Sequence, residues 1–151
     1  MRLRWGPYAT KLAEQVVVID PLYVLDVLDT QPDGGLASVL QDLICRFDAR
    51  PFTVACARCG RAADGVCAYP GSVELIGFCA RCVELSERAR PSPAVRIAGY
   101  DDALRHVATS FRRGHRIEMR RVIKRLLGAK GGPACITETA MLGFFLGMGK
   151  D

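Results

Sequence analysis

Four cysteines form the clearest chemical pattern in this sequence. They make two C-x2-C pairs separated by nineteen residues: Cys56, Cys59, Cys79 and Cys82. A two-residue spacing lets one tight turn present both thiolates to the same ion, and Gly60 suits the left-handed backbone of such a turn. The spacing is typical of a zinc ribbon. Because four thiolates fill a tetrahedral coordination sphere, we predict a structural rather than a catalytic Zn2+.

Other uses of these cysteines explain the pattern less well. A redox C-x-x-C pair needs no second pair at this distance, and burial of free thiols needs no spacing at all. Cys67 lies between the pairs and is the second choice as a ligand, because it lacks a C-x-x-C partner. Cys45 and Cys135 stand in apolar surroundings, and we expect both to be buried. An odd count of seven cysteines argues against a disulfide scaffold, and no secretory signal is readable, so we expect a cytoplasmic protein.

A second pattern is the concentration of positive charge near the C-terminus. The net charge is +5, and residues 91–151 hold 11 basic and 5 acidic groups. Cations spaced three and four apart lie along one side of a helix, and a polyanion would offset their mutual repulsion. We predict nucleic-acid contacts from Arg112, Arg113, His115, Arg116, Arg120, Arg121, Lys124, Arg125 and Lys130. The alternatives are a solvated face in an arginine-rich protein and a docking surface for an acidic protein.

Groups for catalysis are sparse. Phosphate-binding loops, nucleophile elbows and zinc-protease motifs are absent from the sequence. Asp101 and Asp102 form an acidic pair that helix capping explains, and His106 is expected on the surface, opposite an apolar stripe. We therefore predict a protein without enzymatic activity; a metal-dependent nuclease is the alternative.

The elements that carry these residues predict an α+β fold in three parts. These are a small N-terminal helical module (1–50), a central zinc ribbon (51–90) and a basic C-terminal helical segment (91–151), with a boundary at Pro91–Pro93. The expected helices are Pro21–Asp29, Leu36–Phe47, Val83–Arg90, Arg116–Gly128 and Glu138–Met148, and one that Asp101 or Asp102 caps and that Arg113 and Gly114 end. The expected strands are Arg2–Trp5, Phe52–Ala55 and Ser72–Phe78. The longest apolar stretch, Ala140–Met148, is too short to cross a membrane.

Residues 5–28 resemble the C-terminal domain of exodeoxyribonuclease X-like proteins and the related quorum-sensing-regulated virulence factor family. Both families have an aromatic-Gly-Lys-Tyr start followed at a fixed interval by Asp-Pro-x-Tyr. The matching residues here are Gly6, Tyr8, Lys11, Glu14, Val16, Ile19, Asp20, Pro21 and Tyr23. The departures are Pro7 where lysine is usual, Thr10 where glycine is usual and Asp26 where tryptophan is usual. The resemblance implies a compact accessory module of proteins that handle nucleic acids, without a catalytic motif.

Taken together, these features predict a non-enzymatic zinc-ribbon protein that binds DNA or RNA. We expect it to act as an accessory protein or subunit of a prokaryotic or phage nucleoprotein complex, with other protein subunits as partners and no membrane. It is similar in size and character to the small zinc-finger subunits of CRISPR effector complexes. The alternatives are a metal-dependent nuclease and an adaptor whose basic face binds an acidic protein.

Overall fold

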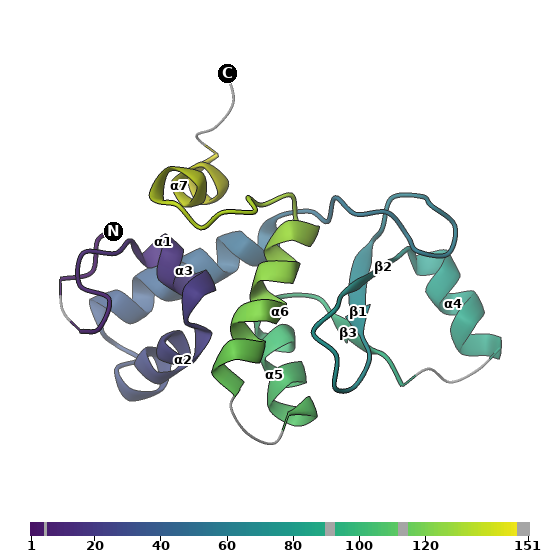
Figure 1. The fold of residues 1–151 in the computed structure, drawn as a ribbon, viewed down its shortest axis with the longest axis horizontal. Helices are drawn as coiled ribbons and strands as arrows, with labels where there is room; N and C mark the ends of the chain where they lie inside the picture. The colour runs from purple at the N-terminus through teal and green to yellow at the C-terminus, as the bar shows by residue number, and fades with distance from the viewer. Residues whose placement is uncertain (5, 90–92, 112–114, 148–151) are drawn as a thin grey trace.

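A computed structural model describes residues 1–4, 6–89, 93–111 and 115–147, without the side chains of residues 86, 87 and 89. Within these ranges the chain forms helices and a small antiparallel sheet, which confirms the α+β class. The helices are α1 (Ala13–Ile19), α2 (Pro21–Thr30), α3 (Gly35–Ala49), α4 (Ala80–Ala89), α5 (Tyr100–Ser110), α6 (His115–Ala129) and α7 (Glu138–Leu146). The strands are β1 (Gly65–Ala68), β2 (Ile76–Phe78) and β3 (Val95–Ile97). Figure 1 shows α5 and α6 between the N-terminal helices on one side and the sheet with α4 on the other.

The N-terminal helices begin where local chemistry satisfies their first backbone N–H groups. Asp20 accepts a hydrogen bond from Tyr23 N and precedes Pro21, so the predicted start of α2 is confirmed. The sequence did not predict α1. Its run of β-branched residues is buried on all sides, with Val16, Val17 and Val18 fully inaccessible to solvent, and burial of each stabilises the fold by about 1.5–3 kcal/mol. This tertiary burial outweighs the weak helix preference of valine.

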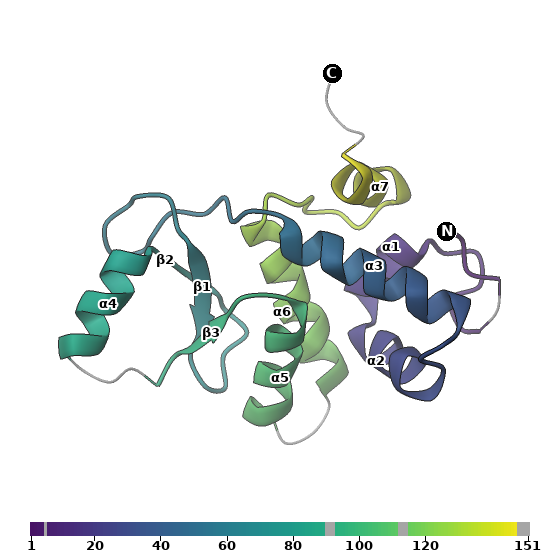
Figure 2. The ribbon, with the colours of Figure 1, turned by 180° about the vertical axis from the view of Figure 1, so that it is seen from behind.

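One hydrophobic core joins the first and last parts of the chain. It extends from Leu3 to Phe145 and includes α1, α3, α5, α6 and α7. Figure 2 shows α3 ending beside the C-terminal end of α6. At that junction Lys130 Nζ donates to the carbonyl oxygens of Asp48 and Arg50, at 3.0 and 2.8 Å. The segments that we predicted as N-terminal module and C-terminal helices therefore share their apolar interior.

The sheet has the strand order β2-β1-β3, with both pairings antiparallel. Val66 pairs with Gly77 on one side and Ile97 on the other, so these three residues share a face. Val66 and Ile97 on this face are buried in the shared core. Cys67 pairs with Ile76 and Arg96, so these residues share the opposite face. The sheet thus has one face packed on helices and a second face directed toward the cysteine region.

Several local predictions are wrong. The predicted strand at Phe52–Ala55 forms only a single bridge, between Ala55 and Ala62, and the strand Gly65–Ala68 was not predicted. Asp101 and Asp102 do not cap α5, because the helix begins at Tyr100 and both lie within its first turn. Asp48 of α3 accepts the hydrogen bond from Tyr100 N at 2.8 Å.

Burial also differs from prediction at three positions. Cys45 and Cys135 are exposed rather than buried. His106 is buried rather than on the surface, and its Nε2 lies 2.7 Å from Ser72 O. That partner stands 34 residues away in the sequence, so local periodicity could not place the histidine.

Within the described residues, the helices fall short of the length and apolar character that a membrane crossing requires.

Candidate metal centre and nucleic-acid interface

The four cysteines of the two C-x2-C pairs converge at one point. Their sulfur atoms all lie within 4.8 Å of one another. A tetrahedral zinc site with Zn–S bonds of about 2.3 Å places its sulfurs about 3.8 Å apart. Cys59 Sγ and Cys79 Sγ, which come from different pairs, are 3.6 Å apart. These cysteines are positioned to bind a metal ion, and the described part of the chain holds no other such cluster of three or more ligands.

Backbone hydrogen bonds hold the first pair in a tight turn. Cys56 N donates to Arg61 O, and Gly60 N donates to Cys56 O. Gly60 has a φ of +74°, which confirms the predicted left-handed turn. The turn rests on β2 through the bond from Ala57 N to Gly77 O. A Cβ atom at position 77 would lie 2.4 Å from Ala55 O, so only glycine lets the turn approach the strand this closely.

The second pair is held at the start of α4. Val83 N donates to Cys79 O in the first turn of this helix. Asp64 Oδ2 accepts from Ala80 N at 2.7 Å, and Asp64 N donates to Phe78 O. Asp64 therefore ties the start of β1 to the second cysteine pair. We did not predict its role, because its partners stand 14 and 16 residues away in the sequence.

The electrostatics of the cluster favour a bound cation. Backbone N–H groups of Cys59, Cys79 and Arg58 donate to Cys56 Sγ and lower the pKa of this thiol to about 6. Proton sharing with Cys79, together with burial, raises the pKa of Cys82 to about 12. The Cys56 thiolate is therefore stabilised, and its negative charge is one of the factors that oppose ionisation of the Cys82 thiol. A divalent ion removes this conflict, because it holds all its cysteine ligands as thiolates.

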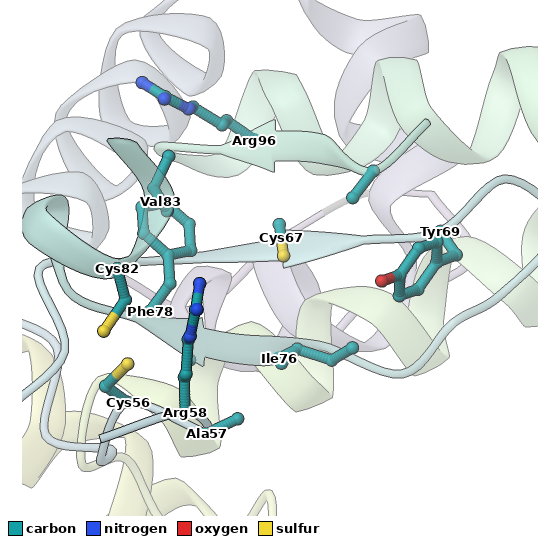
Figure 3. Close-up of a pocket in the computed structure, with 12 residues that line it drawn as sticks. Cys56, Ala57, Arg58, Cys67, Tyr69, Ile76, Phe78, Cys82, Val83 and Arg96 are labelled. Atoms are coloured by element: carbon teal, nitrogen blue, oxygen red, sulfur yellow. The ribbon is translucent and has the colours of Figure 1, made fainter. Parts of the chain in front are cut away.

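Cys67 does not join the cluster. It lies half-buried on the outer face of the sheet, where burial raises the pKa of its thiol. Figure 3 shows it on β1, at some distance along the sheet from Cys56 and Cys82. The structure thus favours the four paired cysteines over Cys67 as ligands.

The predicted nucleic-acid contacts lie on or beside α6. Arg120, Arg121 and Lys124 are exposed, and none of them forms an ion pair within the described part of the chain. Arg116 and Arg125 are also exposed, but each is paired: Arg116 with Asp20 and Arg125 with Glu74, both at 2.8 Å. The predicted residues Arg112 and Arg113 lie outside the described residues. We call the five exposed cations of α6 the basic face: Arg116, Arg120, Arg121, Lys124 and Arg125.

Two predicted contacts differ from the rest. His115 is half-buried at the first turn of α6, and its Nδ1 has no hydrogen-bond partner among the described residues. Lys130 is only 3% exposed, so its prediction as a surface contact is wrong. Its ammonium group lies 4.4 Å from the ring centroid of Phe52 and bonds two carbonyl groups, and burial lowers its pKa. Lys130 joins α3 to α6 and is not available to a ligand.

The basic face is hollowed at both sides. One hollow of about 410 Å³ lies between α6 and the N-terminal helices, beside Tyr8 and Asp20. The Asp20 side chain is nearly buried and accepts from the Tyr8 hydroxyl as well as from Arg116. Burial, together with this hydrogen bond, raises the pKa of Tyr8. A second hollow of about 430 Å³ lies beside Val73 and Glu74.

The residues of the N-terminal resemblance do meet in space. The rings of Tyr8 and Tyr23 pack edge to face with centroids 5.3 Å apart, and Gly6, at a φ of +84°, lies against the Tyr23 hydroxyl. Comparison with protein-family models, curated proteins and solved structures finds no match to this chain. The resemblance to the exodeoxyribonuclease X-like module therefore stays a prediction.

Proposed function

We propose that this protein binds nucleic acid through the basic face of α6 and uses the four-cysteine centre as a structural zinc site. The single observation that carries the proposal is the set of exposed cations at Arg120, Arg121 and Lys124, which have no ion-pair partner among the residues that the structure describes. Unpaired like charges three and four residues apart cost each helix pair a few tenths of a kcal/mol. A phosphate backbone offsets this cost and gains further free energy from counterion release.

The paired arginines support the same function by fixing the two ends of the basic face. The buried carboxylate of Asp20 holds Arg116 at the N-terminal end of α6. Glu74, in the loop before β2, holds Arg125 at the C-terminal end. Between these ends, arginine guanidinium groups are suited to bidentate phosphate contacts.

The metal centre supports this function through position rather than chemistry. Four cysteine ligands leave zinc no open coordination site for substrate. The cysteine region connects to α6 through the hydrogen bond from Thr53 N to Ala129 O, at 2.8 Å. We assign the ion a role in holding the sheet and the Glu74 loop beside α6, and we propose no catalytic step for it.

Charge removal with a matched control tests the proposal. The strip variant combines Arg120→Ala, Arg121→Ala and Lys124→Ala. The control variant removes the same number of charges elsewhere, through Arg46→Ala, Arg88→Ala and Arg105→Ala, which lie exposed on α3, α4 and α5. Binding of labelled single-stranded and duplex oligonucleotides is measured by fluorescence anisotropy. We expect the strip variant to lose roughly tenfold to hundredfold in affinity, similarly for unrelated sequences, while the control loses much less.

Equal losses in both variants would contradict the proposal, because they would reflect net charge alone. An unchanged affinity in the strip variant would also contradict it. If the parent protein instead retains a stoichiometric acidic protein after nuclease treatment and the strip variant does not, the basic face is a protein-docking surface and the nucleic-acid proposal fails.

A further inference from the structure

The outer face of the sheet carries a cavity that adjoins the metal centre, since Cys56 and Cys82 line one end of it. Pairing of Cys67 with Ile76 and Arg96 puts these three side chains on that face, and Phe78 follows two residues after Ile76. The cavity has a volume of about 250 Å³ and reaches from the cysteine turn to Tyr69 (Figure 3). Drug-sized ligands occupy about 300–1,000 Å³, so this cavity suits a single small planar group.

Two aromatic rings stand at opposite ends of the cavity. Tyr69 is 48% exposed, so one face of its ring is open to a ligand. The ring of Phe78 packs directly on the backbone of Gly65. A Cβ atom at position 65 would lie 3.0 Å from Phe78 Cζ, so a larger residue would displace the ring. Figure 3 shows Phe78 and Tyr69 on either side of Cys67 along the sheet. An exposed ring and an adjoining apolar floor form a stacking platform.

Two arginines line the cavity, beside the ligand cysteines Cys56 and Cys82. Arg58 from the cysteine turn and Arg96 from β3 line it, and the described residues around it include no acidic side chain. The Arg96 guanidinium lies 5.9 Å from the ring centroid of Phe78. Stacking surfaces combined with cations match a planar aromatic group that carries a phosphate.

The cavity is continuous with the basic face along the edge of β2. Ala57, Ile76 and Gly77 line the cavity and also line a shallow hollow on the other side of this strand. Lys124 and Arg125 of the basic face line that same hollow. A strand whose phosphates lie on α6 would therefore need to cross only the edge of β2, beside the Glu74–Arg125 ion pair, to enter the cavity.

We propose that the cavity binds one unpaired base of a single-stranded nucleic acid, stacked on Tyr69, with the neighbouring phosphate held by Arg58 and Arg96. This inference rests on the proposed function, in that the rest of the strand lies along α6, and it names single strands as the preferred ligand. A base paired within a duplex has no free face to place in the cavity. Stacking is tolerant of sequence because every base has an aromatic face.

The test uses the full-length, metal-loaded protein and substitutions at Tyr69. Tyr69→Ala removes the ring, Tyr69→Phe keeps it, and Leu85→Ala removes an equally exposed apolar side chain of α4 that does not line the cavity. We expect Tyr69→Ala to weaken binding of a 15-nucleotide single strand about five- to tenfold and duplex binding less than about twofold. Tyr69→Phe and Leu85→Ala should stay within about twofold of the parent for both ligands. Equal losses on single strand and duplex, or a Tyr69→Phe loss equal to that of Tyr69→Ala, would overturn the inference.

A mononucleotide separates this inference from the proposed function. Adenosine monophosphate is titrated into the parent, the strip variant and Tyr69→Ala, and amide chemical shifts are followed by NMR. We expect shifts of the β1–β3 amides in the parent and equally in the strip variant, but not in Tyr69→Ala. Suppose that the strip variant binds oligonucleotides as tightly as the parent does, and that adenosine monophosphate still shifts the β1–β3 amides. The proposed function of the basic face then fails, while the base-binding cavity stands. Absence of the shifts in the parent overturns the base site, and so does mononucleotide affinity equal to that of the oligonucleotide, because the ligand is then a free nucleotide.

Discussion

At the residue scale, Asp20 serves the fold and the surface at once. It precedes the predicted helix start at Pro21, and one of its oxygens accepts the hydrogen bond from Tyr23 N. Its second oxygen accepts from the Tyr8 hydroxyl and pairs with Arg116. One nearly buried carboxylate therefore starts α2, anchors the N-terminal loop and orients the first cation of the basic face. A buried charge with several partners of this kind is costly to leave unmatched.

The assignment of the metal ligands gives a prediction at the same scale. Cys79→Ser should abolish binding of one zinc per chain, because Cys79 Sγ lies within the cluster. Cys67→Ser is the matched control and should keep the metal, because Cys67 is absent from the cluster. Zinc content is measured by elemental analysis of protein purified under reducing conditions. Retention of zinc in Cys79→Ser together with its loss in Cys67→Ser would show that the ligand assignment is wrong.

At the scale of elements, the sequence predicts those features whose cause is local. The start of α2 at Pro21 and the left-handed turn at Gly60 after the first cysteine pair depend on neighbours in the chain, and both predictions are confirmed. The helix α1 depends on its full burial by other helices, which periodicity does not report. His106 and Lys130 find their partners 34 and about 80 residues away. The sheet cavity likewise combines residues from separate segments.

The capping of α5 by Asp48 of α3 gives a prediction about pH. Burial raises the pKa of Asp48, although the hydrogen bond from Tyr100 N opposes this shift. A carboxyl group whose pKa is higher in the folded state stabilises the fold below its unfolded pKa, and this contribution is lost as pH rises through the folded pKa. Asp48→Asn keeps an acceptor oxygen for Tyr100 N and does not titrate. The free energy of unfolding of the parent, relative to Asp48→Asn, should therefore fall as the pH rises from about 4 toward neutral.

Urea unfolding of both proteins across this pH range measures the difference. A difference that grows with rising pH would contradict the account, because it would mean that the fold prefers the charged carboxylate.

At the scale of the whole molecule, the apolar interior and the metal centre are separate. The shared core contains residues from both ends of the chain, while Cys56, Cys79 and Cys82 form a small cluster of their own. The basic face lies on α6, which packs in the core through Met119, Val122 and Leu126. The basic face is therefore built on the part of the fold that depends least on the metal.

Metal removal tests this division. A chelator under reducing conditions should unfold the cysteine turn and destabilise α4, because the binding energy of a structural metal contributes to folding. Most of the helical circular dichroism signal should remain, since the other helices pack in the shared core. Complete loss of the helical signal would show that the shared core depends on the metal. No change in thermal stability would show that the metal does not contribute to folding.

The central claim is that nucleic acid binds along the basic face, and the salt dependence of binding tests it most directly. The affinity of the unmodified, metal-loaded protein for a single-stranded oligonucleotide is measured at several salt concentrations. With three to five phosphate contacts, the slope of log affinity against log salt should lie between about −2 and −3.5. No detectable binding at about 0.15 M salt, or a slope near zero, would contradict the claim.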